Sequence, residues 1–285
     1  EARVRGEYRR DAFQLDRTLY YPNDAVFADG FDSNLPPGGY APSGAEKKGV
    51  VTYAEANSVL PFVNNLWTTT LTGAQLRSVL EEQWQPAGSS RPYLQLGLSS
   101  NVTYTYNPDA PAGSHINRIW VNGKQVDPPD TFRIGSFSFL LAGGDNFNTF
   151  KAGTNTKDSG LVDYEAWIDY LKASSPVKPS FIKHGVGITS SPAAKVGESY
   201  TLKVTNLDLT SIGSPANTTL KVSVDGEVVA DNVRVADGAA QATFVVKHNG
   251  PVVLTANPSG TVVQGSVVIS KVDAKSLSPK ASAKV

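Results

Sequence analysis

The chain has 285 residues, of which 40% are hydrophobic and 18% are charged, and basic and acidic residues balance at 26 each. This length is enough for two domains of ordinary size, and the composition is typical of a globular protein. A net charge of zero gives no indication of a nucleic-acid partner or of an electrostatic membrane anchor. The chain contains no cysteine, which excludes disulfides, thiol catalysis and Cys-ligated zinc.

Hydropathy and methionine content bear on the origin of the chain. No apolar run is long enough to cross a membrane, so no transmembrane helix is expected, and no signal peptide is recognisable. The chain contains no methionine. We interpret it as a processed or excised piece of a longer protein.

The N-terminal part of the chain shows few regular signals. Residues 1–23 carry arginines among acids and aromatic residues, and we interpret them as a linker that leads into the first domain. Residues 24–28 form a short apolar strand candidate. A loop rich in glycine and proline follows at 29–39.

Two capping boxes predict two helices. In a capping box, the N-cap side chain and the side chain three positions later each accept a hydrogen bond from the other residue's backbone N–H. Thr52-x-x-Glu55 opens a short helix that Pro61 ends, which leaves Phe62 on a loop, where ligand contacts tend to lie. Thr72-x-x-Gln75 opens a second helix, whose apolar residues recur at helical spacing up to about Trp84.

Alternating apolar residues predict several strands in the first part of the chain. Asn122-Gly123 is a type I′ turn signal and predicts a hairpin between the runs on either side of it. Apolar residues at helical spacing over 161–171 indicate a last helix, with Pro176 beyond its end. Helices and strands in this order predict an α+β domain with a mixed sheet. The strand runs cover 94–98, 102–106, 116–121, 124–126 and 132–139.

The pattern changes from Gly185 onward, where helix signals stop. Short apolar runs with turn signals between them predict strands, and Asp225-Gly226 predicts a hairpin turn. We therefore expect residues 185–271 to form a small all-β sandwich, most similar to bacterial Ig-like modules. Residues 272–285 are rich in Lys, Ala, Ser and Pro and are interpreted as a tether or a disordered tail.

One stretch carries a candidate binding site. Phe139 ends the strand predicted over 132–139, and Gly143 and Gly144 follow, where the backbone can turn sharply and let a ligand approach closely. The ionised side chain of Asp145 only accepts hydrogen bonds, which suits a pair of hydroxyls. An aromatic face beside a diol acceptor fits a nucleoside, with stacking for the base and hydrogen bonds for the ribose. The alternative is a core phenylalanine and an aspartate that caps its own turn.

Three motifs follow one another along the chain: Leu60-Pro61-Phe62, Leu71-Thr72-Gly73-x-x-Leu76 and Phe139-x-x-x-Gly143-Gly144-Asp145-x-Phe147. In these motifs and their separations, residues 24–183 resemble the C-terminal domain of 5′-nucleotidases, a family that includes bacterial UDP-sugar hydrolases. In that family two phenylalanines sandwich the base and an aspartate binds the ribose. The matching positions here are Phe62, Phe139 and Asp145. The resemblance therefore implies a nucleotide or nucleoside as the partner.

One loop departs from the family pattern. Family members continue after the strand at 24–28 with an Asn-x-Gly-Gly-x-Arg loop that contacts the nucleotide. In this chain the glycine pair of the 29–39 loop comes late, at Gly38-Gly39, and no arginine follows it. The resemblance thus implies that the base sandwich is kept while the phosphate clamp is altered.

The motifs of phosphate hydrolysis do not occur in the sequence. 5′-Nucleotidases hold two metal ions in a separate N-terminal metallophosphoesterase domain, with motifs of the Asp-x-His and Gly-His-x-His kind. Here His115, His184 and His248 are isolated, and each is expected to be a surface or turn residue. The resemblance implies no cofactor in this chain and a divalent metal pair in the missing domain. The chain alone is therefore expected to bind substrate but not to cleave it.

Two functions remain open. The first is the nucleotide-recognition domain of an exported bacterial 5′-nucleotidase, a hydrolase of nucleotide catabolism, with an Ig-like spacer and without its catalytic half. The second is a non-catalytic cell-surface or adhesion protein built on a degenerate 5′-nucleotidase domain, which the altered 29–39 loop favours. The retained Phe62, Phe139 and Asp145 favour the first. Lack of cysteine fits export, so an extracellular or cell-wall location is expected.

Overall fold

The computed structural model describes residues 53, 56–57, 60, 62–175, 180–191, 194–209, 214–248 and 250–267. The predicted linker at 1–23, strand at 24–28, loop at 29–39 and tail at 272–285 lie outside these residues. So do Thr52, Glu55 and Pro61 of the first predicted helix. Of that helix, Tyr53, Ala56 and Asn57 are described and are helical.

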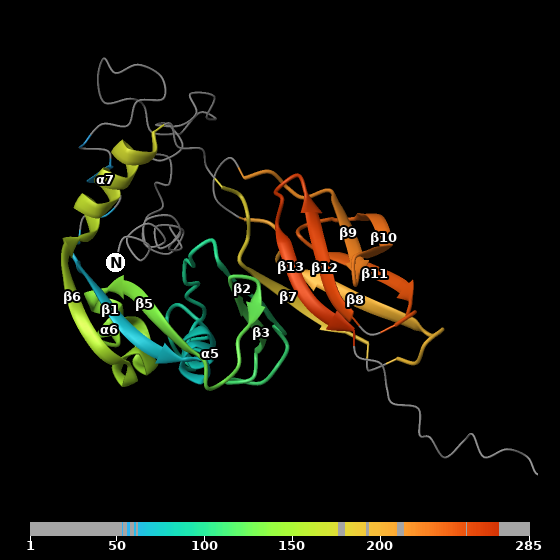
Figure 1. Cartoon of the computed structure of the whole chain (residues 1–285), viewed down its shortest axis with the longest axis horizontal. Helices are drawn as coiled ribbons and strands as arrows, with labels where there is room; N and C mark the ends of the chain where they lie inside the picture. Colours follow the sequence, from blue (N-terminus) through green and yellow to red (C-terminus); the bar gives the residue numbers. More distant parts are fainter. Residues whose placement is uncertain are drawn as a thin grey trace, which may run out of the picture.

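The first sheet has three antiparallel strands in the order β5-β1-β6 (Figure 1). The central strand β1 spans Asn65–Thr72, β5 spans Thr131–Phe137, and β6 spans Thr154–Val162. The sequence pattern predicts β5 but neither β1 nor β6. Because β1 pairs with both neighbours, it fixes the ends of β5 and β6 relative to one another.

Two predicted strands differ from the structure. The strand expected over 132–139 ends at Phe137, and Ser138–Leu141 form the short helix α6, so Phe139 lies in a helical turn. The strand expected over 94–98 is wrong. Leu94 and Leu96 are buried, but they reach the core from an extended segment that belongs to no named strand.

The second capping box is confirmed at the start of helix α5, Gly73–Glu81. The Thr72 hydroxyl accepts from the Gln75 backbone N–H at 3.2 Å, and the Gln75 side chain accepts from the Thr72 N–H at 2.7 Å. The helix ends before the predicted limit at Trp84. The last helix, α7, spans Asp163–Ser174 and so starts two residues later than expected.

Two further sheets contain the other strands (Figure 1). The six-stranded sheet has the order β11-β8-β7-β2-β3-β4, and the four-stranded sheet has the order β10-β9-β12-β13. The Asn122-Gly123 and Asp225-Gly226 turns are confirmed, since all four residues have positive φ. The strands are β2 (Val102–Tyr106), β3 (Ile116–Val121), β4 (Lys124–Gln125), β7 (Gly185–Ser190), β8 (Ser199–Thr205), β9 (Thr219–Val224), β10 (Glu227–Arg234), β11 (Ala240–Val245), β12 (Gly250–Asn257) and β13 (Val262–Val267).

The six-stranded sheet runs across the predicted boundary between residues 24–183 and 185–271. Strand β7 pairs in parallel with β2, with Gly185 beside Tyr104. A Cβ atom on Gly185 would lie 2.3 Å from the Tyr104 ring, so the missing side chain makes room for the ring. Burial raises the pKa of Tyr104 to about 12, and its hydroxyl is hydrogen-bonded to Gln83. The domain division stays a prediction, but its two parts share this sheet.

The two largest hydrophobic cores of the described residues lie on either side of this junction, and a small third cluster surrounds Trp167 of α7. The first packs β1, α5, α6, β2 and β3 together, and the second fills the space between the four-stranded sheet and strands β7, β8 and β11. Mixed and antiparallel sheets with few helices agree with the expected α+β class. The Ig-like character of the C-terminal part stays a prediction. No described helix has the length and apolar character that a membrane span requires.

Candidate functional site

The β1–β5 pair brings the two predicted phenylalanines to one end of the first sheet. Leu66 of β1 lies opposite Phe137 of β5, so the start of β1 and the end of β5 lie at the same end of the sheet. Phe62 comes shortly before β1 in the chain, and Phe139 follows β5 in helix α6. Phe62 is 60% exposed and Phe139 is 48% exposed. Core phenylalanines are buried, so the exposure of these two does not fit the core alternative.

The turn that carries Phe62 is tied to the start of α7. Val63 has φ +55°, a left-handed conformation that is unfavourable for a β-branched residue. The next residue, Asn64, donates from its backbone N and from its Nδ2 to Asp163 Oδ2, both at 3.1 Å, and its carbonyl accepts from the Asp163 backbone N at 2.9 Å. Asp163 is fully buried, so this contact holds the strained turn in place. Asp163 was not among the predicted site residues, because no local sequence pattern links it to residue 64.

The Phe139 ring lies directly on Gly144, the second residue of the glycine pair. A Cβ atom on Gly144 would come within 2.4–2.6 Å of three atoms of the ring. Gly143 has φ +85°, and a Cβ atom there would lie 2.2 Å from Cε of Lys151. The space that the two glycines leave is therefore filled by Phe139 and Lys151 of this chain. Close approach of a ligand at these glycines stays a prediction.

Asp145 lies in the turn after the glycines with φ +51° and ψ +33°, again left-handed. Its Oδ1 is 3.3 Å from a guanidinium nitrogen of Arg91, and both side chains are partly exposed. This contact leaves the other carboxylate oxygen, Oδ2, as a candidate acceptor for a diol. Arg91 comes from the loop after α5, where a single arginine has no spacing signal that would predict this contact.

Glu82, the C-cap of α5, holds the far end of the same turn. Its carboxylate accepts from the Thr149 backbone N at 3.0 Å and from the Thr149 hydroxyl at 2.8 Å. Burial raises the pKa of Glu82 above its ordinary value, and the hydrogen bonds from Thr149 oppose that effect. The turn that presents Asp145 is thus anchored to a helix terminus of the first core.

His115 is not the surface or turn residue that the sequence predicts. It is 6% exposed, its ring stacks on Trp84 at 4.1 Å with an interplanar angle of 1°, and its Nδ1 is 3.1 Å from a Glu81 carboxylate oxygen. Flat stacking on an indole explains the burial of this ring. In the part of the chain that the structure describes, no three His, Asp or Glu side chains are grouped as a metal site would require.

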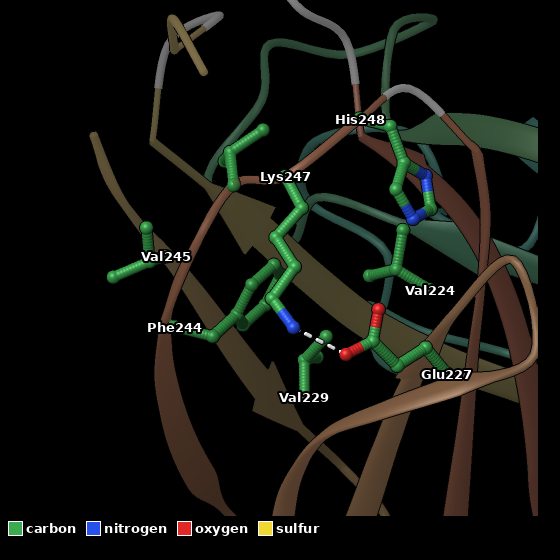
Figure 2. A pocket seen from close by; sticks show the side chains of 8 residues that line it. Val224, Glu227, Val229, Phe244, Val245, Lys247 and His248 are labelled. Atoms are coloured by element: carbon green, nitrogen blue, oxygen red, sulfur yellow. Dashed lines mark hydrogen bonds and ion pairs between the residues drawn. The ribbon is translucent and has the colours of Figure 1, made fainter. Parts of the chain in front are cut away.

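Two hollows lie away from these residues. One, in the C-terminal part, holds about 10 Å³ beside the Lys247–Glu227 ion pair (Figure 2), which is room for about one water. The other, about 280 Å³, is lined mainly by apolar residues of β5, α5 and the segment over 96–102. Neither is lined by the five predicted site residues, which are Phe62, Phe139, Gly143, Gly144 and Asp145.

Comparison with known families identifies the first part of the chain. Residues 25–152 match the family described as "5'-nucleotidase, C-terminal domain". This match confirms the resemblance for that part of the chain, which carries β1, β5, α5 and the turn with Asp145.

Individual relatives match over a similar share of the chain. The "Trifunctional nucleotide phosphoesterase protein YfkN" of Bacillus subtilis is 30% identical over 133 residues, which are 44% of this chain and 9% of that protein. A "5'-nucleotidase" of Vibrio vulnificus is 28% identical over 45% of this chain and 22% of its own length. Among solved structures, a 5′-nucleotidase precursor from Thermus thermophilus is 30% identical over 48% of this chain and 28% of its own, with a TM-score of 0.43. The chain thus spans a quarter or less of these two curated relatives.

Proposed function

We propose that this chain recognises a nucleotide or nucleoside as the substrate-binding part of an exported 5′-nucleotidase. The proposal is supported by the exposure of Phe62 and Phe139, which flank the paired ends of β1 and β5, and by the contact of the Phe139 ring with Gly144, next to Asp145. The match of residues 25–152 to the 5′-nucleotidase C-terminal domain supports it.

Each part of the proposed site has a distinct task. The two rings stack on the base, and such stacking is worth about 1–3 kcal/mol per base by alanine substitution. The Asp145 carboxylate accepts hydrogen bonds from the ribose hydroxyls, while the contact with Arg91 orients it. Because the sequence lacks the family's arginine after the 29–39 loop, base and sugar carry more of the binding than phosphate does.

Cleavage in this proposal belongs to another part of the protein. A divalent metal pair would be held by an N-terminal metallophosphoesterase domain and would activate the water that attacks the phosphate. The present chain contributes binding and orientation, the Ig-like module serves as a spacer, and the whole protein acts outside the cell or at its wall. The altered 29–39 loop favours the rival function, a non-catalytic cell-surface or adhesion protein built on a degenerate 5′-nucleotidase domain.

Titration calorimetry with adenosine, AMP and free ribose tests the proposal. We expect adenosine and AMP to bind with similar affinity and ribose to bind far more weakly, because stacking of the base is lost. Phosphate release from AMP, ADP and UDP-glucose, measured with added Mn²⁺, Zn²⁺ or Mg²⁺, should stay at background. Absence of adenosine binding would favour the adhesion function. Turnover that copurifies with the chain would contradict the proposal that cleavage belongs to a separate N-terminal domain.

A further inference from the structure

The turn that presents Asp145 is unusual in its backbone. Gly143, Asp145 and Asn146 all have positive φ, at +85°, +51° and +65°. Glycine adopts this conformation freely, but a side-chain-bearing L-residue pays a steric penalty for it. Two such residues in succession persist only where surrounding contacts hold them.

One side-chain amide contacts both of these strained residues. Gln85 Nε2 donates to the backbone carbonyl of Asp145 at 3.0 Å, and Gln85 Oε1 accepts from Asn146 Nδ2 at 2.8 Å. The same Nε2 also donates to the Glu82 carbonyl at 2.8 Å, at the end of α5. The amide therefore bridges the helix terminus and the turn, with one hydrogen bond to each of the two left-handed residues.

The segment that carries Gln85 is itself fixed. Its backbone N donates to the Pro92 carbonyl at 3.0 Å, and Trp84 forms a β-bridge with Tyr93. Trp84 is in turn stacked on the buried His115. Arg91, which contacts the Asp145 carboxylate, lies within this closed loop. The loop thus contacts Asp145 at its carbonyl through Gln85 and at its carboxylate through Arg91.

We propose that Gln85 is a positioning residue for ribose recognition: it holds the Asp145–Asn146 turn in the left-handed conformation that aims the Asp145 carboxylate at the sugar. This inference rests on the proposed function. It concerns the sugar more directly than the base, because Gln85 contacts Asp145 and Asn146, whereas Phe62 lies on the turn before β1 and Phe139 on helix α6. Loss of the Gln85 amide should therefore reduce selection of ribose while base stacking persists.

Two variants test this role. Gln85→Met keeps the length of the side chain and removes the amide, and Gln85→Asn keeps the amide but is one methylene too short to reach the turn. The matched control is Gln125→Met on β4, where the glutamine contacts Arg118 at an exposed site. For each variant, calorimetry gives the ratio of adenosine to 2′-deoxyadenosine affinity, and hydrogen exchange gives the protection of amides 143–149.

We expect an adenosine preference of about fivefold in the wild type and in Gln125→Met, as one lost hydrogen bond to a carboxylate predicts. In both Gln85 variants the ratio of adenosine to 2′-deoxyadenosine affinity should fall toward one. Hydrogen exchange of amides 143–149 should become faster, while the melting temperature changes little. If the wild type shows the preference and both Gln85 variants retain it, the positioning role is wrong and the proposed function stands. If the wild type binds no nucleoside, the proposed function fails, and this inference fails with it.

Discussion

Substituting Phe62 or Phe139 should change nucleoside affinity without changing stability, because these residues are 60% and 48% exposed. Truncating an exposed side chain changes the free energy of unfolding by no more than about 0.5 kcal/mol, whereas truncating a core phenylalanine costs about 3–5 kcal/mol. We therefore predict that Phe62→Ala and Phe139→Ala each weaken adenosine binding by about 1–3 kcal/mol and leave urea denaturation nearly unchanged.

The matched control for this pair is Phe244→Ala, since Phe244 is buried in the second core. That variant should lose stability on the scale of a core phenylalanine. The stacking role would be refuted if Phe62→Ala and Phe139→Ala lost stability to a similar extent while the affinity for adenosine stayed constant.

Glu82 makes the stability of the folded protein depend on pH, and the sign of this dependence follows from the burial of Glu82. Its pKa in the folded protein is raised above 4.5, so the folded state holds the proton more tightly than the unfolded state does. Stability from this group is therefore complete below the ordinary pKa and declines as pH rises through the raised one. Glu82→Gln removes this decline and still accepts from Thr149. We predict that the stability of Glu82→Gln relative to wild type increases from about pH 4 to about pH 7 in urea denaturation; a constant difference would contradict the assignment.

At the scale of elements, local sequence patterns correctly predicted helix caps and turns that depend on contacts between residues close together in the chain. The Thr72–Gln75 capping box and the Asn122-Gly123 turn each involve residues a few positions apart, and both are confirmed. Strand β1 was missed because its threonine-rich run lacks clean alternation, and β6 because nearly all of its residues are exposed. His115 was misjudged because its stacking partner, Trp84, lies far away along the chain.

Gly185 of β7 offers a test of how the N-terminal and C-terminal parts of the chain are joined. A Cβ atom on Gly185 would lie 2.3 Å from the buried Tyr104 ring, whereas a Cβ atom on Gly265 of β13 would meet only Val252, at an ordinary 3.7 Å. We predict that Gly185→Ala lowers the free energy of unfolding by about 1–3 kcal/mol, as overpacking does. The control Gly265→Ala should change it by no more than about 0.5 kcal/mol. Equal effects would show that the β2–β7 contact is less tight than the structure has it.

At the scale of the whole molecule, the six-stranded sheet joins the two predicted domains. Strands β2 and β7 pair in parallel, and the Tyr106 hydroxyl accepts from Asn206 Nδ2 at 2.5 Å across the junction. A spacer that is independent of the binding part would unfold separately. We instead predict a single calorimetric transition whose calorimetric and van't Hoff enthalpies agree. Two resolved transitions would show that the shared sheet does not couple the parts.

The sequence motifs indicated candidate site residues but none of the residues that hold them in place. Phe62, Phe139 and Asp145 were proposed from motifs, and the two phenylalanines flank the paired ends of β1 and β5. Arg91, Asp163 and Gln85 were not identified, because each contacts the site from a distant part of the chain. Such contacts depend on tertiary packing, which a single sequence without a motif at those positions does not reveal.

The most direct test of the central claim is the selection of ribose by Asp145. Calorimetry should compare adenosine, 2′-deoxyadenosine and 3′-deoxyadenosine on the wild type and on Asp145→Asn. Because a hydrogen bond to a carboxylate is worth about 1 kcal/mol or more, the wild type should bind adenosine roughly fivefold more tightly than either deoxynucleoside. Asp145→Asn should lose this preference. Equal binding of all three nucleosides by the wild type, or a variant that keeps the preference and only melts at a lower temperature, would contradict the account.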